Sequence, residues 1–163
     1  MVLGMSLATF TLVHVLISIV GIASGLIVME RLVRNRALGL SNTIFLVTTI
    51  ATSATGFLFP FNGFTPALAF GVFSLVILAV ALFALYAGNL IGAWRWIYVV
   101  TAVIALYLNV FVAVVQAFQK VGRLRALAPT QSEPAFALAQ GAVLILFVLI
   151  GVVALRRFRP PTA

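Results

Sequence analysis

The stretch TLVHVLISIVGIASG, residues 11–25, decides how this chain is interpreted. Small or polar residues recur in it at alternating steps of three and four, so they share one face of a helix. These residues are Thr11, His14, Ser18, Gly21 and Gly25. A histidine inside an apolar helix is costly unless it faces protein or water, and a glycine pair lets a second helix approach closely. We therefore predict that this face of the first helix points into a helical bundle.

The composition is that of an integral membrane protein. Of the 163 residues, 64% are hydrophobic and 7% are charged, and the mean hydropathy is +1.29, far above that of a soluble domain. Apolar runs, most of them long enough to cross about 30 Å of hydrocarbon, follow one another at about 7–29, 41–59, 66–87, 96–118 and 135–155. We predict an all-α, five-helix transmembrane bundle, a single domain over residues 1–163, whose longest loop is residues 119–134.

Few side chains can support acid–base or metal chemistry. The chain has no cysteine and no aspartate, and its titratable acids and imidazole are limited to Glu30, Glu133 and His14. A zinc site needs three or four side-chain ligands, a Ser-His-Asp triad needs an aspartate, and a bis-histidine haem needs two histidines. We therefore predict no catalytic residues, no metal site and no cofactor, and we do not expect an enzyme.

The net charge of +8 does not indicate a nucleic-acid partner. The ten basic residues form short clusters between the apolar runs, as juxtamembrane charges do. The chain also lacks the GxxxxGK[ST] and GxGxxG loops that hold nucleotide phosphates. We expect membrane lipid, rather than nucleic acid, to surround most of this protein.

The basic clusters also predict the orientation. An odd number of spans places the two termini on opposite sides, and the positive-inside rule assigns the more basic side to the cytoplasm. The side with more basic residues carries Arg31, Arg34, Arg36, Arg95, Arg156, Arg157 and Arg159, and the other side carries Lys120, Arg123 and Arg125. We predict that the N-terminus lies outside and the C-terminus in the cytoplasm.

Polar side chains continue into the second and fourth apolar runs. The second run has a face rich in hydroxyl groups that includes Thr52 and Thr55, and the fourth carries Asn109 and Gln116. Two interpretations stay open here. The side chains either form hydrogen bonds within a dry, tightly packed bundle or line a cavity.

The predicted orientation brings several of these residues to a similar depth near the outer side. We predict an outward-facing polar pocket, with a ligand-binding set of His14, Thr52, Thr55, Asn109, Gln116 and Glu133. We assign helix packing to Ser18, Gly21 and Gly25. His14 is the titratable contact of this predicted pocket.

Three short runs carry a resemblance over nearly the whole chain: TGFLFPF at residues 55–61, AWRWIY at 93–98 and APTQSEP at 128–134. They resemble a group of small, functionally uncharacterised five-span proteobacterial inner-membrane proteins. The resemblance implies a multi-pass protein of the bacterial inner (cytoplasmic) membrane and no known activity. In size and span count the chain is also similar to the tryptophan-rich sensory proteins, but it has only Trp94 and Trp96, and we transfer no residues from that family.

Two hypotheses for function follow. In the first, the outer pocket around His14 binds or translocates a small, lipophilic or weakly polar molecule. In the second, the chain is a non-catalytic membrane subunit or homo-oligomer whose polar stripes are helix-packing interfaces. The first implies a small-molecule ligand, and the second implies another copy or subunit as the partner.

Overall fold

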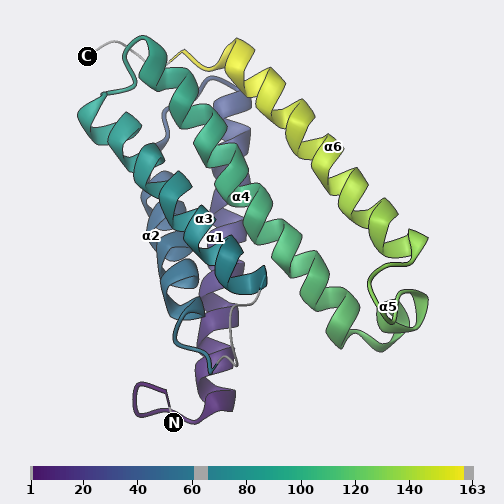
Figure 1. Cartoon of the computed structure of the whole chain (residues 1–163). Coiled ribbons are helices and arrows are strands. Elements are labelled where there is room, and N and C mark those ends of the chain that lie inside the picture. The colour runs from purple at the N-terminus through teal and green to yellow at the C-terminus, as the bar shows by residue number, and fades with distance from the viewer. Residues whose placement is uncertain (1, 61–65, 160–163) are drawn as a thin grey trace.

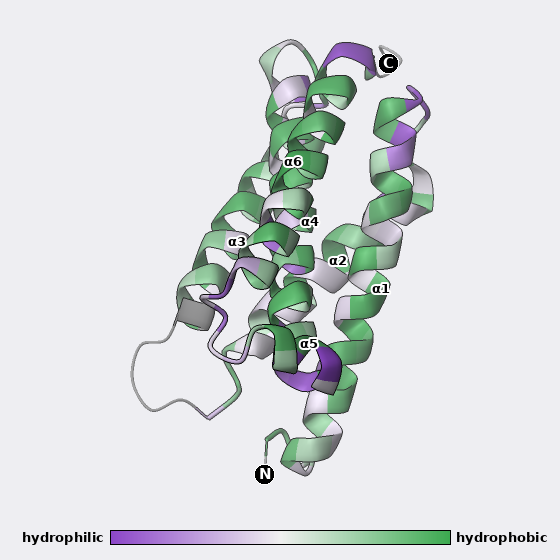
Figure 2. Cartoon of the chain, turned by 90° about the vertical axis from the view of Figure 1, so that its right-hand side faces the viewer, coloured by the Kyte–Doolittle hydropathy of each residue, from purple (hydrophilic) through white to green (hydrophobic). Residues whose placement is uncertain are grey.

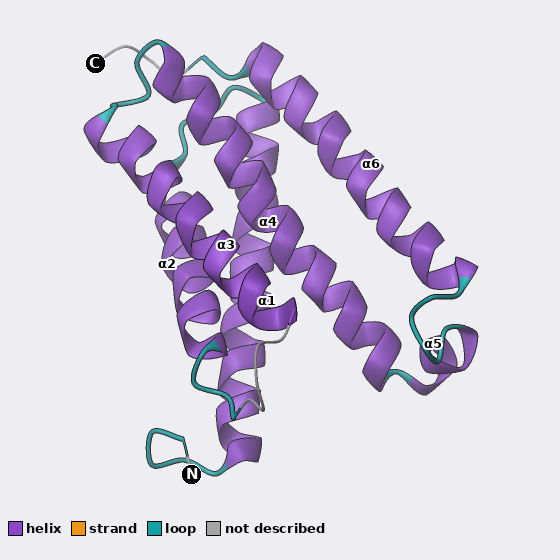
Figure 3. Cartoon of the chain, viewed as in Figure 1, coloured by secondary structure: helices purple, strands orange, loops and turns teal. Residues whose placement is uncertain are grey.

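The computed structural model describes residues 2–60 and 66–159, and these residues form helices without any strand (Figure 3). In chain order the elements are α1 (Leu7–Val33), α2 (Gly39–Gly56), α3 (Pro66–Leu82), the π-helical turn η1 (Phe83–Ala87), α4 (Ala93–Lys120), α5 (Gly122–Leu127) and α6 (Pro134–Arg157). The all-helical class predicted from the sequence is confirmed for this part of the chain.

The five long helices run alternately up and down the bundle (Figure 1). Helix α4 is central, because α1, α2, α3, α5 and α6 all contact it. Helices α1 and α2 form a closely packed pair on one side of α4, and α6 lies along its other side. This order buries the first half of α4 most deeply: Tyr98, Val99, Ala102, Ala105 and Leu106 are all fully buried.

Four helical segments of the described chain are long and apolar enough to cross a membrane, namely Leu7–Val33, Leu68–Ala87, Ala93–Lys120 and Pro134–Arg157. Helix α2 runs beside them with 18 residues, and its hydroxyl groups make it the least apolar of the long helices. Hydrophilic residues gather toward the two ends of the bundle, with apolar helix between them (Figure 2). The architecture is that of a multi-pass membrane protein.

The helix boundaries correct several details of the sequence prediction. Helix α1 continues to Val33 instead of 29, helped by an ion pair of 3.0 Å between Glu30 and Arg34 one turn apart. Helix α2 covers Gly39–Gly56 instead of 41–59. The predicted loop at 119–134 was wrong in part, because it contains the short helix α5. The run predicted at 66–87 is helical throughout, but its last turn widens into η1.

The helices approach closely where α1, α2 and α4 meet. Gly25 of α1 is buried there, and a Cβ atom built on it would lie 2.6 Å from Cδ1 of Leu106 and 2.9 Å from Cδ2 of Phe45. The phenol of Tyr98 on α4, which is fully buried, donates a hydrogen bond to Oδ1 of Asn42 on α2. Both contacts bind α4 to the α1–α2 pair.

The end of the bundle where α1 and α6 finish is rich in arginine. The guanidinium of Arg95, at the start of α4, donates to the carbonyl oxygens of Leu155 (3.1 Å) and Phe158 (2.7 Å) at the end of α6. The backbone N–H of Arg159 donates to Oδ1 of Asn35 at 2.6 Å, beyond the end of α1. A cation interacts favourably with the free carbonyl groups at a helix C-terminus, as Arg95 does here. The contacts of Arg95 and Asn35 together hold the C-terminal end of α6 against the bundle.

Candidate functional site

The histidine of α1 bonds directly to a threonine of α2. Nδ1 of the half-buried His14 lies 2.8 Å from Oγ1 of Thr55, whose own hydroxyl donates to the carbonyl oxygen of Ala51 at 2.7 Å. When the single proton of the Thr55 hydroxyl lies on the Ala51 carbonyl, Nδ1 of His14 is the donor of this bond, and Nε2 of the neutral ring is then an acceptor. Among the described residues, none bonds to Nε2. The imidazole is thus oriented by α2, with one nitrogen available.

Ser18 and Thr52 form the next contact along the α1–α2 seam, one turn deeper into the bundle. The hydroxyl of Ser18 lies 2.8 Å from the carbonyl oxygen of His14 and 3.3 Å from Oγ1 of Thr52. The same small face of α1 thus touches α2 at both His14 and Ser18. Four residues that the sequence analysis selected from two separate helices are joined in this seam.

Asn109 of α4 forms a hydrogen bond with α2 beside the contact surface between α1 and α2. Its Nδ2 donates to Oγ1 of Thr49, a fully buried residue of α2, at 3.2 Å. Gly21 makes room for this contact, since a Cβ atom on it would lie 3.2 Å from Oγ1 of Thr48 and 3.7 Å from Nδ2 of Asn109. The Asn109 amide therefore links α4 to α2 at a point where α1 also packs closely. Thr49, its partner, is not in the ligand-binding set predicted from the sequence.

Gln116 and Glu133 do not join His14 in a hydrogen-bonded set. Gln116 is exposed and makes no hydrogen bond with any described residue. The Glu133 carboxylate binds its own loop, accepting from the Thr130 N–H (3.1 Å), the Thr130 hydroxyl (2.9 Å) and the Ser132 N–H (3.1 Å). Desolvation raises the pKa of Glu133, but the hydrogen bonds that its carboxylate accepts together lower it by more, so the net pKa lies below its ordinary value.

Two aromatic side chains that the sequence analysis did not select lie beside His14. The ring of Phe59 meets the imidazole edge to face, with centroids 5.1 Å apart, and Phe10 lies against Phe59 at 4.9 Å. Phe10 is buried, which is consistent with an apolar wall at this end of the α1–α2 seam. Phe10 lies one turn before His14 in the chain, so helical spacing alone could have suggested it.

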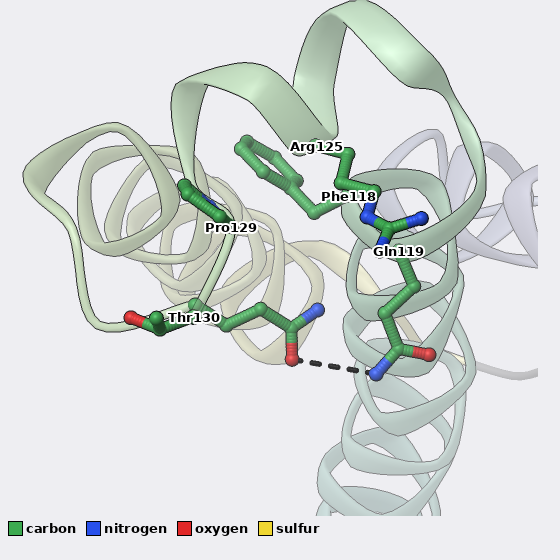
Figure 4. Close-up of a pocket in the computed structure, with 6 residues that line it drawn as sticks. Phe118, Gln119, Arg125, Pro129 and Thr130 are labelled. Atoms are coloured by element: carbon green, nitrogen blue, oxygen red, sulfur yellow. Dashed lines mark hydrogen bonds between the residues drawn. The ribbon is translucent and has the colours of Figure 1, made fainter.

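A pocket of about 460 Å³ opens elsewhere, where α4 ends and the chain turns through α5 to α6 (Figure 4). Its lining residues are Phe118, Gln119, Arg125, Pro129, Thr130 and Gln131. The side chain of Gln131 is held in place by donation from its Nε2 to the carbonyl oxygen of Val115 at 3.0 Å. The sequence predicts a loop here and does not predict the pocket, because only the turn through α5 brings residues 118 and 131 together.

The chemistry available at both places is limited to hydrogen bonding, apolar contact and charge. Within residues 2–60 and 66–159, there is no group of three or more His, Cys, Asp or Glu side chains that could hold a metal ion. The His14 seam offers one imidazole acceptor beside aromatic rings, and the α4–α6 pocket offers a guanidinium and amides.

Comparisons with known proteins add no relatives. No protein-family model matches the chain, and no match was found among curated proteins or solved structures. The resemblance to uncharacterised inner-membrane proteins therefore stays a prediction.

Proposed function

We propose that this protein binds or translocates a small, weakly polar or lipophilic molecule at an intramembrane site organised by His14. The observation that carries the proposal is the contact of 2.8 Å between Nδ1 of His14 and Oγ1 of Thr55. It fixes the ring in one orientation and leaves Nε2 to accept a hydrogen bond from an N–H or O–H group of a ligand. Polar groups inside apolar spans are costly and commonly mark binding or transport pathways.

In this proposal the chain crosses the bacterial inner membrane five times, α2 included, with the N-terminus outside and the C-terminus in the cytoplasm. The alternating directions of the five long helices and the arginine-rich end formed by α1, α4 and α6 support this topology. His14 then lies in the outer part of the membrane, with Phe10 and Phe59 beside it.

The second hypothesis is a non-catalytic subunit or homo-oligomer with packing stripes, and hydrogen bonds between helices support its packing part. Ser53 on α2 donates to Ser74 on α3 at 3.0 Å, and Asn109 donates to Thr49 at 3.2 Å. These contacts lie within one chain, so this part of the polar stripes is used for internal packing. Ordinary structural hydrogen bonds between membrane helices explain them.

The proposed orientation predicts opposite labelling of two single-cysteine variants. The chain has no native cysteine, so each variant carries one thiol in a clean background. Ser132→Cys, in the exposed loop before α6, is expected to react with a membrane-impermeant maleimide in intact cells. Ala37→Cys, between α1 and α2, is expected to react only after the membrane is opened. The reverse pattern would invert the topology, and labelling of both in intact cells would contradict the odd number of spans.

The His14 site predicts that a small molecule copurifies with the protein. Native mass spectrometry of protein extracted in a mild, uncharged detergent is expected to show a bound small molecule, and His14→Gln is expected to lose it. The glutamine amide can still donate to Thr55, so the variant should fold, but its remaining acceptor, Oε1, accepts from a different position and direction than Nε2 of the imidazole.

Thr11→Val is the matched control, because the Thr11 hydroxyl bonds within its own helix, to the Leu7 carbonyl at 2.8 Å. It should retain the bound molecule. Retention of the same mass in a folded His14→Gln variant would contradict the role given to His14. Absence of any bound mass from the wild type would favour the packing hypothesis.

A further inference from the structure

The pocket between α4, α5 and α6 is lined by one charged side chain, that of Arg125. Arg125 of α5 lines it and is exposed, and its guanidinium forms no ion pair or hydrogen bond with any described residue. Figure 4 shows its guanidinium on the same side of the pocket as Gln119, with Pro129 and Thr130 opposite. A guanidinium presents several N–H groups in a planar fork that matches a carboxylate or phosphate.

The electrostatic surroundings favour an anion. Lys120 and Arg123, which flank the pocket in the chain, are also exposed and unpaired among the described residues. The nearby acid, Glu133, already accepts hydrogen bonds from Thr130 and Ser132 in its own turn. Its negative charge is thus stabilised locally, while the positive charges of the pocket are not.

The rest of the lining supplies amides and an apolar wall. Nε2 of Gln119 lies 3.5 Å from Oε1 of Gln131, at the limit of a hydrogen bond, so the Gln119 amide can turn toward a ligand. The ring of Phe118 is buried and is held edge to face against Phe136, with centroids 5.3 Å apart. Most of the accessible lining is polar, and Phe118 and Pro129 contribute a smaller apolar surface beside the guanidinium.

From these features we infer that the pocket binds a small organic acid, whose carboxylate pairs with Arg125 and whose apolar part lies against Phe118 and Pro129. The volume of about 460 Å³ is within the usual range for a small-molecule site. The acid can come from water, as a short aromatic or aliphatic carboxylate, or from the membrane, as a fatty acid. This site is separate from His14 and stands independently of the function proposed above.

Titration calorimetry of the full chain in uncharged maltoside micelles tests the inference. Benzoate represents the water-soluble source, octanoate the membrane source, and benzamide the uncharged counterpart of benzoate. We expect saturable binding of at least one acid and none of benzamide. Arg125→Gln should weaken that binding about tenfold or more, because it removes a charge-assisted, two-pronged hydrogen bond.

Arg123→Gln is the matched control, since it makes the same change of charge in the same short helix at a residue that does not line the pocket. It should weaken binding less than about threefold. His14→Gln should leave the affinity unchanged, which separates this test from that of the proposed function. Equal losses in the two arginine variants would show a general charge effect and overturn the site. Inorganic phosphate binding as tightly as the acids would refute the apolar wall, and no binding of either acid would refute the inference altogether.

Discussion

Replacing Tyr98 by alanine is expected to lower the free energy of unfolding by about 3–5 kcal/mol, the range found for large aromatic truncations in cores. The side chain is fully buried in the central helix and its phenol donates to Asn42 of α2. Alanine therefore leaves both a cavity and a buried amide without its partner. The measurement is reversible unfolding in mixed micelles, followed by circular dichroism.

Two companion variants separate the causes. Tyr98→Phe keeps the ring and removes only the hydroxyl, so we expect a smaller loss of about 1–3 kcal/mol. Tyr86→Ala is the matched control, because Tyr86 is 64% exposed, and should change stability by about 0.5 kcal/mol or less. A Tyr98→Ala variant as stable as Tyr86→Ala would show that α4 is not packed against α2 as described.

Gly25→Val is expected to be the most damaging glycine substitution in α1. Its Cβ atom would meet Leu106 at 2.6 Å and Phe45 at 2.9 Å, and both of those side chains are fully buried, so neither can move into solvent. Overpacking of this kind typically costs about 1–3 kcal/mol, and more when the neighbours cannot shift. We expect a lower midpoint of thermal unfolding and a lower yield of folded protein.

Gly141→Val makes the same change in α6, where an added Cβ atom meets nothing within 4 Å. It should leave the thermal midpoint close to that of the wild type. Similar losses in the two variants would mean that glycine is needed for reasons other than close helix contact, and would contradict the packing described at Gly25.

Helical periodicity explains why much of this architecture could be predicted. The small and polar residues at steps of three and four from Thr11 to Gly25 do lie along the contacts of α1 with α2 and α4, as Ser18, Gly21 and Gly25 show. Long apolar runs likewise locate the helices to within a few residues. Both patterns depend only on residues that are close in the sequence. They are sufficient to locate a membrane helix, because such a helix forms its backbone hydrogen bonds within its own segment.

The candidate site was harder to predict, because depth in a membrane does not determine which helix faces meet. Gln116 and Asn109 are seven residues apart on one predicted stripe, yet Asn109 bonds to α2 and Gln116 is exposed. Glu133 was grouped with His14 by depth, but its own turn supplies the donors for its carboxylate. The pocket at Arg125 depends on how the chain turns through α5, and no periodic pattern in the sequence predicts the direction of this turn.

The bond from Arg95 to the end of α6 has a consequence for how the protein is made. Its acceptors, Leu155 and Phe158, are synthesised some 60 residues after Arg95. Helices emerge from the ribosome in order, so α1 to α4 are synthesised before the partners of this guanidinium exist. The contact can form only after α6 has been synthesised, and it makes α6, rather than a loop, the element that closes this helical bundle.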